Sequence, residues 1–299
     1  MANKKLGIVT VLYKSAPVLP DFYKSLQNQT YQDFILYVID NNSPDDSLAV
    51  ATALTERASF DCVVIAEKEN WGVAKGNNIG ITRALADGCD YVLLANNDTE
   101  FTPDTLHTLI DSMERNNADM ITPKIDIFGK QLVWYGGGGF GFFCVTYHRG
   151  EWKKDSKKYH KPGFVDYAPT CFMIIKKDVF EKVGMMDERY FVYYDDTDFI
   201  WRAVKGLGYK VYYESSALIQ HKVGSSSKSA SATFGLHYFH RNMAFFMNRY
   251  YDSAMRRIPV YAYYTYLHLK RKLRHPSMPG FITFFKYFRE GQKMYQDMK

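Results

Sequence analysis

Cysteine is scarce in this chain of 299 residues, and its four cysteines are widely separated. None forms a Cys-x-x-Cys pair, and none has a His at the spacing of a metal ligand. This spacing excludes a disulfide framework and a zinc site of the finger type. We therefore expect buried free thiols in a protein of a reducing compartment.

Long apolar runs are also lacking. No stretch of 18 apolar residues occurs, so we expect no membrane-spanning segment. The N-terminus, "MANKKLGIVTVLY", begins with basic residues, but its apolar run is short and no cleavage site follows. It is expected to be a first strand rather than a signal peptide.

Two phosphate-binding motifs are missing as well. The first predicted strand is not followed by G-x-G-x-x-G, and the sequence contains no G-x-x-x-x-G-K-S loop. Both absences argue against a classical dinucleotide fold and a P-loop enzyme. The segment "GVAKGNNIG" (72–80) has glycines four residues apart at a predicted helix start. Close packing of that helix on the sheet and close approach of a ligand both explain them.

What is present is a regular alternation of strand-like and helix-like segments up to about residue 125. The apolar runs "LGIVTVLY", "FILYVID", "CVVIAEK" and "YVLLANND" are separated by helical stretches at 17–29, 44–57, 73–87 and 103–116. This alternation predicts a mostly parallel sheet with helices on its faces. Ligands of such sheets lie beyond the carboxyl ends of the strands, which here are Tyr13, 40–43, 69–72 and 96–98.

A second feature is the crowding of three carboxylates among aromatic residues in "YFVYYDDTDFIWRAV" (190–204). One interpretation is a helix start, with an Asp as N-cap, acids in the first turn and an Asp198–Arg202 pair at i,i+4. The other is chemistry, because neighbouring carboxylates are costly unless a cation, a donor or a proton compensates them. Asp98, at a strand end, and His221, at a loop mouth, are candidate ligands of a divalent cation beside these acids.

Several ordered motifs together resemble the inverting glycosyltransferases of family 2, especially bacterial rhamnosyltransferase-like members. They lie between about residues 6 and 250 and include "ENWGVAKGNNIGITRA", "LLANNDTEF", "VGMMDERYFVYYDDTDFIWRAVKGLGYKV", "HKVGSSS" and "HYFHRNMAFF". Departures from the family pattern are Asn96 for the first acid of D-x-D, Asp195 for Glu, and Thr170 for a frequent glycine.

The resemblance implies an α/β fold of the GT-A type, with a mostly parallel Rossmann-like sheet flanked by helices. A glycosyltransferase domain is expected over 1–240, with a nucleotide-sugar half at about 1–125 and an acceptor half at about 126–240. A basic, aromatic, helical C-terminal extension is expected over 241–299.

The resemblance also implies the site. Asp196, or else Asp195, is the expected base, and Asp198 and Arg202 orient the helix start. Asp98 and His221 are expected to bind Mg²⁺ or Mn²⁺. Residues expected to contact the nucleoside-diphosphate sugar, a dTDP- or UDP-sugar, are Thr10, Tyr13, Asp40, Asn42, Asn70, Gly72, Lys75, Asn78, Asn96 and Asn97. Residues expected to contact the acceptor are Trp134, Tyr135, Thr170, Cys171 and Tyr194.

The charge of the chain is unevenly divided. Residues 241–299 contain 12 Lys or Arg, three acids and 14 Phe or Tyr, and so carry +9, whereas the rest carries −3. Basic and aromatic residues together suit an anionic membrane surface. Packing on the body or in a homodimer explains them too, while no nucleic-acid motif accompanies them.

The expected function is transfer of rhamnose or another hexose to a saccharide acceptor linked to polyprenyl diphosphate, in synthesis of a bacterial surface polysaccharide such as O-antigen or capsule. Its expected place is the cytoplasm, at the inner face of the plasma membrane. The rival functions are a metal-dependent phosphohydrolase and a non-catalytic carbohydrate-binding protein.

Overall fold

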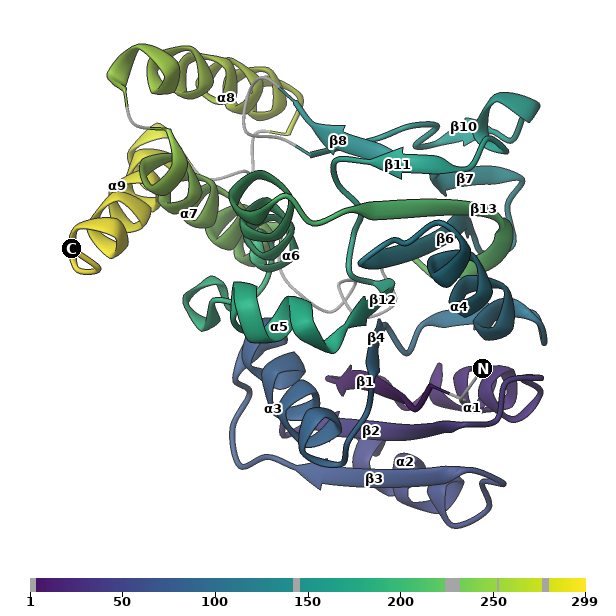
Figure 1. Ribbon diagram of the computed structural model, residues 1–299. Coiled ribbons are helices and arrows are strands. Elements are labelled where there is room, and N and C mark those ends of the chain that lie inside the picture. The colour runs from purple at the N-terminus through teal and green to yellow at the C-terminus, as the bar shows by residue number, and fades with distance from the viewer. Residues whose placement is uncertain (1–3, 142–145, 224–231, 252, 276–279) are drawn as a thin grey trace.

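A computed structural model describes residues 4–141, 146–223, 232–251, 253–275 and 280–299 (Figure 1). The first half follows the predicted alternation closely, because the apolar runs form strands, largely buried except for the partly exposed Asp61–Ala66, and the stretches between them form helices. Its elements are β1 (Leu6–Leu12), α1 (Leu19–Gln27), β2 (Phe34–Asp40), α2 (Ser47–Thr55), β3 (Asp61–Ala66), α3 (Gly72–Ala86), β4 (Tyr91–Ala95), β5 (Thr99–Phe101) and α4 (Thr105–Arg115).

Strands β3, β2, β1 and β4 lie side by side in that order, and all pair in parallel. This confirms the parallel sheet expected for the first half. Parallel pairing directs all four carboxyl ends to one edge, so the segments after β1, β2, β3 and β4 meet there.

The second half extends this sheet with a different pairing. β12 is antiparallel to both β4 and β6, whereas the long β13 runs parallel to β6. Its elements up to β13 are β6 (Met120–Ile127), β7 (Leu132–Tyr135), β8 (Gly138–Phe140), β9 (Thr146–His148), β10 (Lys153–Lys154), η1 (Lys157–Tyr159), β11 (Gly163–Val165), β12 (Phe172–Lys176), α5 (Lys177–Val183), η2 (Glu188–Tyr190), α6 (Asp195–Ile200), η3 (Trp201–Gly206) and β13 (Val211–His221).

The glycines of α3 have two different purposes. A Cβ on Gly76 would lie 2.7 Å from Val11 Cγ1, and one on Gly80 would lie 2.3 Å from Val9 Cγ1, so these two let α3 pack closely on β1. Gly72 has φ +81 and forms part of a pocket wall. Close helix–sheet packing is therefore confirmed for Gly76 and Gly80, and the approach of a ligand at Gly72 stays a prediction.

The glycine-rich segment "VWYGGGGFGFF" (133–143) contributes β7 and β8, with β8 antiparallel to β9. Its last two residues lie outside the described residues, as does the Ser-rich segment 224–231. Of the cysteines, Cys62, Cys89 and Cys171 are free thiols, and Cys144 is not described.

The C-terminal extension is helical, as expected, and consists of α7 (Ala232–Tyr250), α8 (Ala254–Arg274) and α9 (Phe281–Gln296). These helices share a second hydrophobic core, which includes Phe245, Phe246, Phe284 and Phe288, and they lie together on one side of the molecule (Figure 1). The expected boundary at 240/241 falls inside α7. Among the described residues, no helix combines the length and apolar character that crossing a bilayer requires.

Candidate active site

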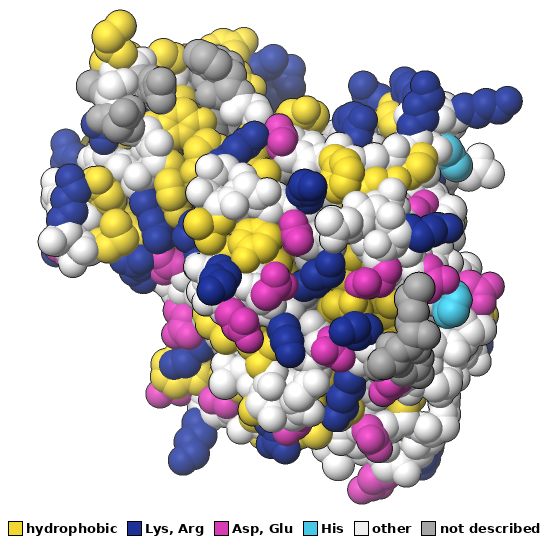
Figure 2. Space-filling model, in the orientation of Figure 1, with side chains coloured by type: hydrophobic (Ala, Val, Ile, Leu, Met, Phe, Trp, Pro, Cys, Tyr) yellow, Lys and Arg dark blue, Asp and Glu magenta, His cyan; other side chains and the backbone are white. Residues whose placement is uncertain are grey.

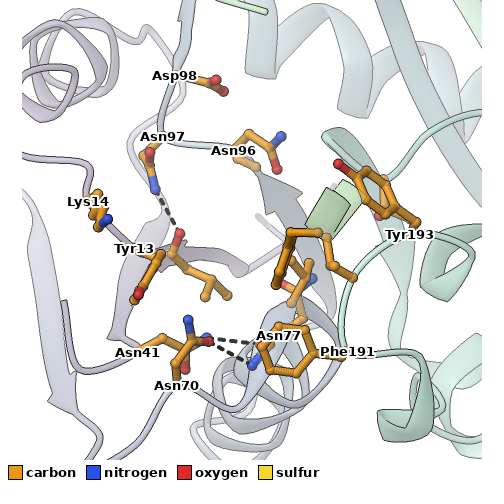
Figure 3. Close-up of a pocket in the computed structure, with 17 residues that line it drawn as sticks. Tyr13, Lys14, Asn41, Asn70, Asn77, Asn96, Asn97, Asp98, Phe191 and Tyr193 are labelled. Atoms are coloured by element: carbon orange, nitrogen blue, oxygen red, sulfur yellow. Dashed lines mark hydrogen bonds between the residues drawn. The ribbon is translucent and has the colours of Figure 1, made fainter. Parts of the chain in front are cut away.

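A pocket of about 500 Å³ opens at the carboxyl edge of the parallel strands (Figure 3). Tyr13 and Lys14, after β1, lie on one side of it, and Phe191 and Tyr193 lie on the opposite side. Its full lining is Val11, Tyr13, Lys14, Asn41, Asn70, Gly72, Val73, Asn77, Ala95, Asn96, Asn97, Asp98, Thr170, Phe191, Val192, Tyr193 and Phe234. Of the expected donor contacts, Tyr13, Asn70, Gly72, Asn96 and Asn97 are therefore brought together.

The end of β2 presents buried hydrogen-bond acceptors. Asp40 is 2 % exposed, and its Oδ2 accepts from Ser43 N, while its Oδ1 has no partner among the described residues. Asn41 donates through Nδ2 to Gly72 O at 2.9 Å, and its Oδ1 is likewise without a described partner. A buried acceptor left unsatisfied is costly, so these two oxygens suit the N–H or O–H groups of a ligand.

Five expected donor contacts do not line the pocket, and the buried Asp40 is one of them. Thr10 is buried, and its Oγ1 lies 3.5 Å from Asn97 Nδ2. Asn42 is exposed and donates to Lys68 O, and the ammonium of Lys75 lies 3.4 Å from the centre of the Trp71 ring. Asn78 donates to Met186 O and accepts from Met186 N. Asn41 and Asn77 line the pocket but were not predicted as donor contacts, although both lie in segments that the sequence motifs marked.

Asp98 and His221, the expected metal ligands, lie in contact although 123 positions separate them. β5 and β13 pair antiparallel with Thr99 opposite His221, which brings His221 Nε2 to 3.1 Å from Asp98 Oδ1. Both side chains are buried, and Trp134 packs its ring edge on His221 at 4.8 Å between ring centres. Within the described residues no group of three His, Cys, Asp or Glu side chains could hold a metal ion. Imidazole and carboxylate are metal-ligand types, but a cation here needs further oxygen atoms, such as those of a diphosphate.

The three acids of the crowded stretch lie in the first turn of α6. The expected Asp N-cap is wrong, because the N-cap position is Tyr194, whose left-handed backbone (φ 66) starts the helix without a side-chain cap. Asp195 is buried, whereas Asp196 is partly exposed. Asp196 Oδ2 accepts a hydrogen bond from Tyr167 Oη at 2.6 Å, and Oδ1 accepts one from Thr197 N. The sequence analysis did not identify Tyr167, which no local motif marks.

Burial raises the pKa values of these two acids. Desolvation and the neighbouring Asp196 raise the pKa of Asp195 to about 8. Desolvation also raises the pKa of Asp196, against the lowering effect of the Tyr167 and Thr197 hydrogen bonds. With a pKa of about 8, Asp195 is mostly protonated at neutral pH, and Asp196, which is partly exposed, is the more accessible of the two acids.

Asp198 is a structural ion-pair residue. It is fully buried, and its two oxygens accept from Arg202 Nε at 2.8 Å and Arg249 Nη1 at 3.0 Å. The expected i,i+4 pair is present, and Arg202 also donates to Val183 O and Met185 O. Asp198 and Arg202 thus fix the start of α6, as expected.

The expected acceptor contacts are divided between the pocket and the interior. Thr170 lines the pocket, and Tyr135 is buried with its hydroxyl donating to Tyr167 O. Tyr194 packs on Phe239 and Phe246 in the second core, and its neighbour Tyr193 lines the pocket instead.

Cys171, another expected acceptor contact, is buried and does not line the pocket. Burial, followed by the carboxylates of Asp98 and Asp196, raises the pKa of its thiol well above the usual value.

Comparison with known proteins gives a consistent result. The family model of Glycosyl transferase family 2 matches residues 7–184. The chain is 24% identical over 251 residues to the N-acetylglucosaminyl-diphospho-decaprenol L-rhamnosyltransferase of Mycobacterium tuberculosis, covering 78% of this chain and 81% of that one. It is 25% identical over 226 residues to the dTDP-rhamnosyl transferase RfbF of Shigella flexneri, covering 75% and 71%. A low-salt glycan biosynthesis hexosyltransferase, Agl10, of Haloferax volcanii is 26% identical over 200 residues, covering 66% of this chain and 61% of that protein.

Solved structures share the fold. GalNAc-T7, crystallised with UDP, GalNAc and Mn²⁺, superposes with a TM-score of 0.65 at 13% identity, covering 84% of this chain and 49% of that one. S. aureus TarS 1–349 in complex with UDP-GlcNAc superposes with a TM-score of 0.57 at 16% identity, covering 80% and 65%. The expected GT-A type of fold is confirmed.

Proposed function

The chain belongs to glycosyl transferase family 2, and we propose that it transfers rhamnose or another hexose from a dTDP- or UDP-sugar to a saccharide hydroxyl. Two relatives named as rhamnosyltransferases support this choice of sugar, and one of them acts on a decaprenol-linked saccharide by its name. We therefore also propose a polyprenyl-diphosphate-linked acceptor, used at the inner face of a bacterial plasma membrane. The observation that carries the proposal is a pocket at the carboxyl edge of the parallel strands, lined by Asn41, whose buried Oδ1 has no described partner, and by Asp98, which is in contact with His221.

The proposed reaction is a single displacement with inversion. Asp196 takes the proton of the acceptor hydroxyl as that oxygen bonds to the anomeric carbon, and the bond from this carbon to the diphosphate oxygen breaks. Partial exposure of Asp196 lets it meet an acceptor, whereas the protonated and buried Asp195 cannot act as a base. The aromatic wall of Phe191 and Tyr193 excludes water that would otherwise hydrolyse the donor.

Asp98 and His221 fit a divalent cation, Mg²⁺ or Mn²⁺, that binds together with the donor. His221 Nδ1 is buried without a described partner, and Nε2 faces the Asp98 carboxylate, so the pair can reorganise around a cation. When bound, such a cation offsets the charge that develops on the departing diphosphate. Because the described residues offer no third His, Cys, Asp or Glu ligand beside this pair, the diphosphate of the donor would complete the coordination.

The C-terminal helices are proposed to contact anionic lipid. On α8, Met255, Ile258, Tyr266, Leu269 and Leu273 recur at spacings that place them on one exposed face. The opposite face carries the buried Val260, Tyr264 and His268. In Figure 2, hydrophobic side chains, with Lys and Arg among them, gather over the region where Figure 1 places α8 and α9. An apolar stripe on a segment of charge +9 suits the interface of an anionic membrane.

The function is tested by thermal stabilisation with a panel of UDP- and dTDP-sugars, each with MgCl₂, MnCl₂ or EDTA. We expect one nucleotide class to stabilise the protein only when the cation is present, and its sugar to be transferred to a polyprenyl-diphosphate saccharide. Asp98→Ala and His221→Ala should lose the cation-dependent part of this stabilisation and keep the melting temperature of the free protein. Release of inorganic phosphate, or binding of saccharide without transfer, would contradict the proposal.

A further inference from the structure

The wall of the pocket formed by Phe191, Val192 and Tyr193 has a strained backbone. Phe191, Tyr193 and Tyr194 have φ angles of 55°, 64° and 66°, in the left-handed region that side chains other than glycine rarely adopt. Such a conformation is unfavourable and persists only where the surroundings of the residue fix it. The next two residues in the sequence are the acids Asp195 and Asp196.

One side of this loop is held by α3. Val73 N donates to Phe191 O at 2.5 Å, and a Cβ on Gly72 would lie 2.3 Å from the same oxygen. The first turn of α3 can therefore approach the loop this closely only because residue 72 is a glycine.

On the other side, the amide of Asn242 in α7 lies close to three carbonyl oxygens of the loop. The Nδ2 of Asn242 lies 2.7 Å from Tyr190 O, 2.8 Å from Val192 O and 2.8 Å from Tyr193 O. Asn242 is fully buried, so no water replaces these bonds if the side chain is removed.

The amide is itself fixed in orientation. Arg241 Nε donates to Asn242 Oδ1 at 2.8 Å, which leaves the Nδ2 group facing the loop, and Arg241 Nη2 donates to Arg189 O. Further along α7, Arg249 and Tyr250 bind the buried Asp198 carboxylate at 3.0 and 2.7 Å. α7 thus contacts the chain both before and after the Asp195–Asp196 pair.

We propose that Asn242 is a positioning residue for the transfer reaction. By binding three carbonyl groups it keeps 190–194 in the conformation that forms the pocket wall, and it fixes the point from which α6 presents Asp196. This inference rests on the proposed function for its kinetic part. It makes α7 a component of the active site and not only a part of the basic extension.

The test compares three Asn242 variants with a control on the same helix. Asn242→Asp keeps the shape and loses the N–H donors, Asn242→Ala removes the group, and Asn242→Ser keeps one donor in a smaller side chain. The control is Asn248→Ala, because Asn248 donates to Ala244 O and Tyr261 Oη, inside the helical bundle and away from the loop. Two readouts are used on the full chain: amide hydrogen exchange over 190–197, and kcat and KM for the donor.

We expect Asn242→Asp and Asn242→Ala to exchange faster over 190–197 and to lower kcat by about tenfold or more, the rate equivalent of losing one hydrogen bond. Asn242→Ser should give exchange rates and a kcat between those of these two variants and those of the unchanged protein. Asn248→Ala should keep the kcat of its folded fraction and the exchange of this segment.

The proposal is overturned if Asn242→Asp leaves both exchange and kcat within about twofold of the unchanged protein. It is also overturned if Asn242→Ala and Asn248→Ala lower kcat equally, since that pattern reports bundle stability alone. If no nucleotide sugar is turned over by the unchanged protein, the proposed function fails, while hydrogen exchange still decides whether Asn242 holds the loop. Failure of Asn242→Ala to fold leaves the decision to the Asp and Ser variants.

Discussion

Two adjacent carboxyl groups, on Asp195 and Asp196, differ in what they can do at neutral pH. Burial keeps Asp195 protonated, with a pKa raised to about 8, whereas Asp196 is partly exposed and accepts two hydrogen bonds from its neighbours. We expect Asp196→Asn to lower kcat by about 10²–10⁴-fold, the usual contribution of a general base, and to leave donor binding nearly unchanged. Steady-state kinetics measures kcat, and calorimetric titration with the nucleotide measures donor binding.

Asp195→Asn is the matched control. Because Asp195 is already neutral, an amide of the same shape should cost less than tenfold in kcat. A larger loss with Asp195→Asn than with Asp196→Asn would reverse the assignment of the base.

Tyr167 should set the pH at which this base works. Its hydroxyl donates to Asp196 at 2.6 Å, which stabilises the ionised carboxylate and so opposes the rise in the pKa of Asp196 caused by burial. In Tyr167→Phe that opposition is lost, the pKa of Asp196 rises, and the acidic limb of the kcat profile should move to higher pH by about one unit.

The control for this shift is Tyr135→Phe. Tyr135 donates only to the backbone oxygen of Tyr167, so its loss should lower stability without moving the acidic limb. A limb that stays in place in Tyr167→Phe would show that Tyr167 does not tune the base.

At the scale of elements, the close contact of α7 and α9 depends on a glycine. A Cβ on Gly291 would lie 2.0 Å from Arg241 O and 2.9 Å from Ala244 Cβ. Gly291→Ala should therefore separate the two helices and lower the free energy of unfolding by about 1–3 kcal/mol, the usual cost of overpacking. Urea unfolding measures this loss.

Gly206→Ala is the comparison, since a Cβ there meets nothing within 4 Å. It should be neutral or stabilise by up to about 1 kcal/mol. Equal behaviour of the two variants would mean that α7 and α9 are not closely packed in solution. Because Arg241 is next to Asn242, Gly291→Ala should also reduce kcat.

At the scale of the whole molecule, the division of charge predicts how the protein associates with membranes. The +9 extension should be attracted to anionic lipid by roughly 1 kcal/mol for each basic residue near the surface, and the apolar stripe of α8 should add to this. We expect co-sedimentation with phosphatidylglycerol liposomes at low salt and much less at high salt, because the Debye length falls to about 8 Å at physiological ionic strength.

Two sets of substitutions separate the contribution of charge to lipid binding from that of the apolar stripe. Replacing Lys270, Arg271, Lys272 and Arg274 with Ser should remove the salt-dependent part, whereas Ile258→Ser with Leu273→Ser should weaken binding at every salt concentration. Binding that ignores both sets would refute the lipid contact, and a change of sedimentation coefficient in the Ile258 and Leu273 variant alone would indicate a homodimer interface.

Local patterns in the sequence were enough to predict the elements and the family. Hydrophobic periodicity is local, so strands such as Leu6–Leu12 and helices such as Gly72–Ala86 were predictable to within a few residues, and motif order indicated the family. The strand-end rule found Tyr13, Asn70 and Asn97, because parallel pairing sends every strand end to one edge.

Only the tertiary structure decided which residues meet across long separations. The Asp98–His221 contact depends on the pairing of β5 with β13, and the Tyr167–Asp196 bond joins two segments through side chains alone. Asn242 lies in the motif "HYFHRNMAFF", but nothing in that motif indicates that its side chain binds a loop about 50 residues earlier. Such contacts depend on how whole elements pack, and packing is a property of the surfaces that residues form together, which no single segment of sequence contains.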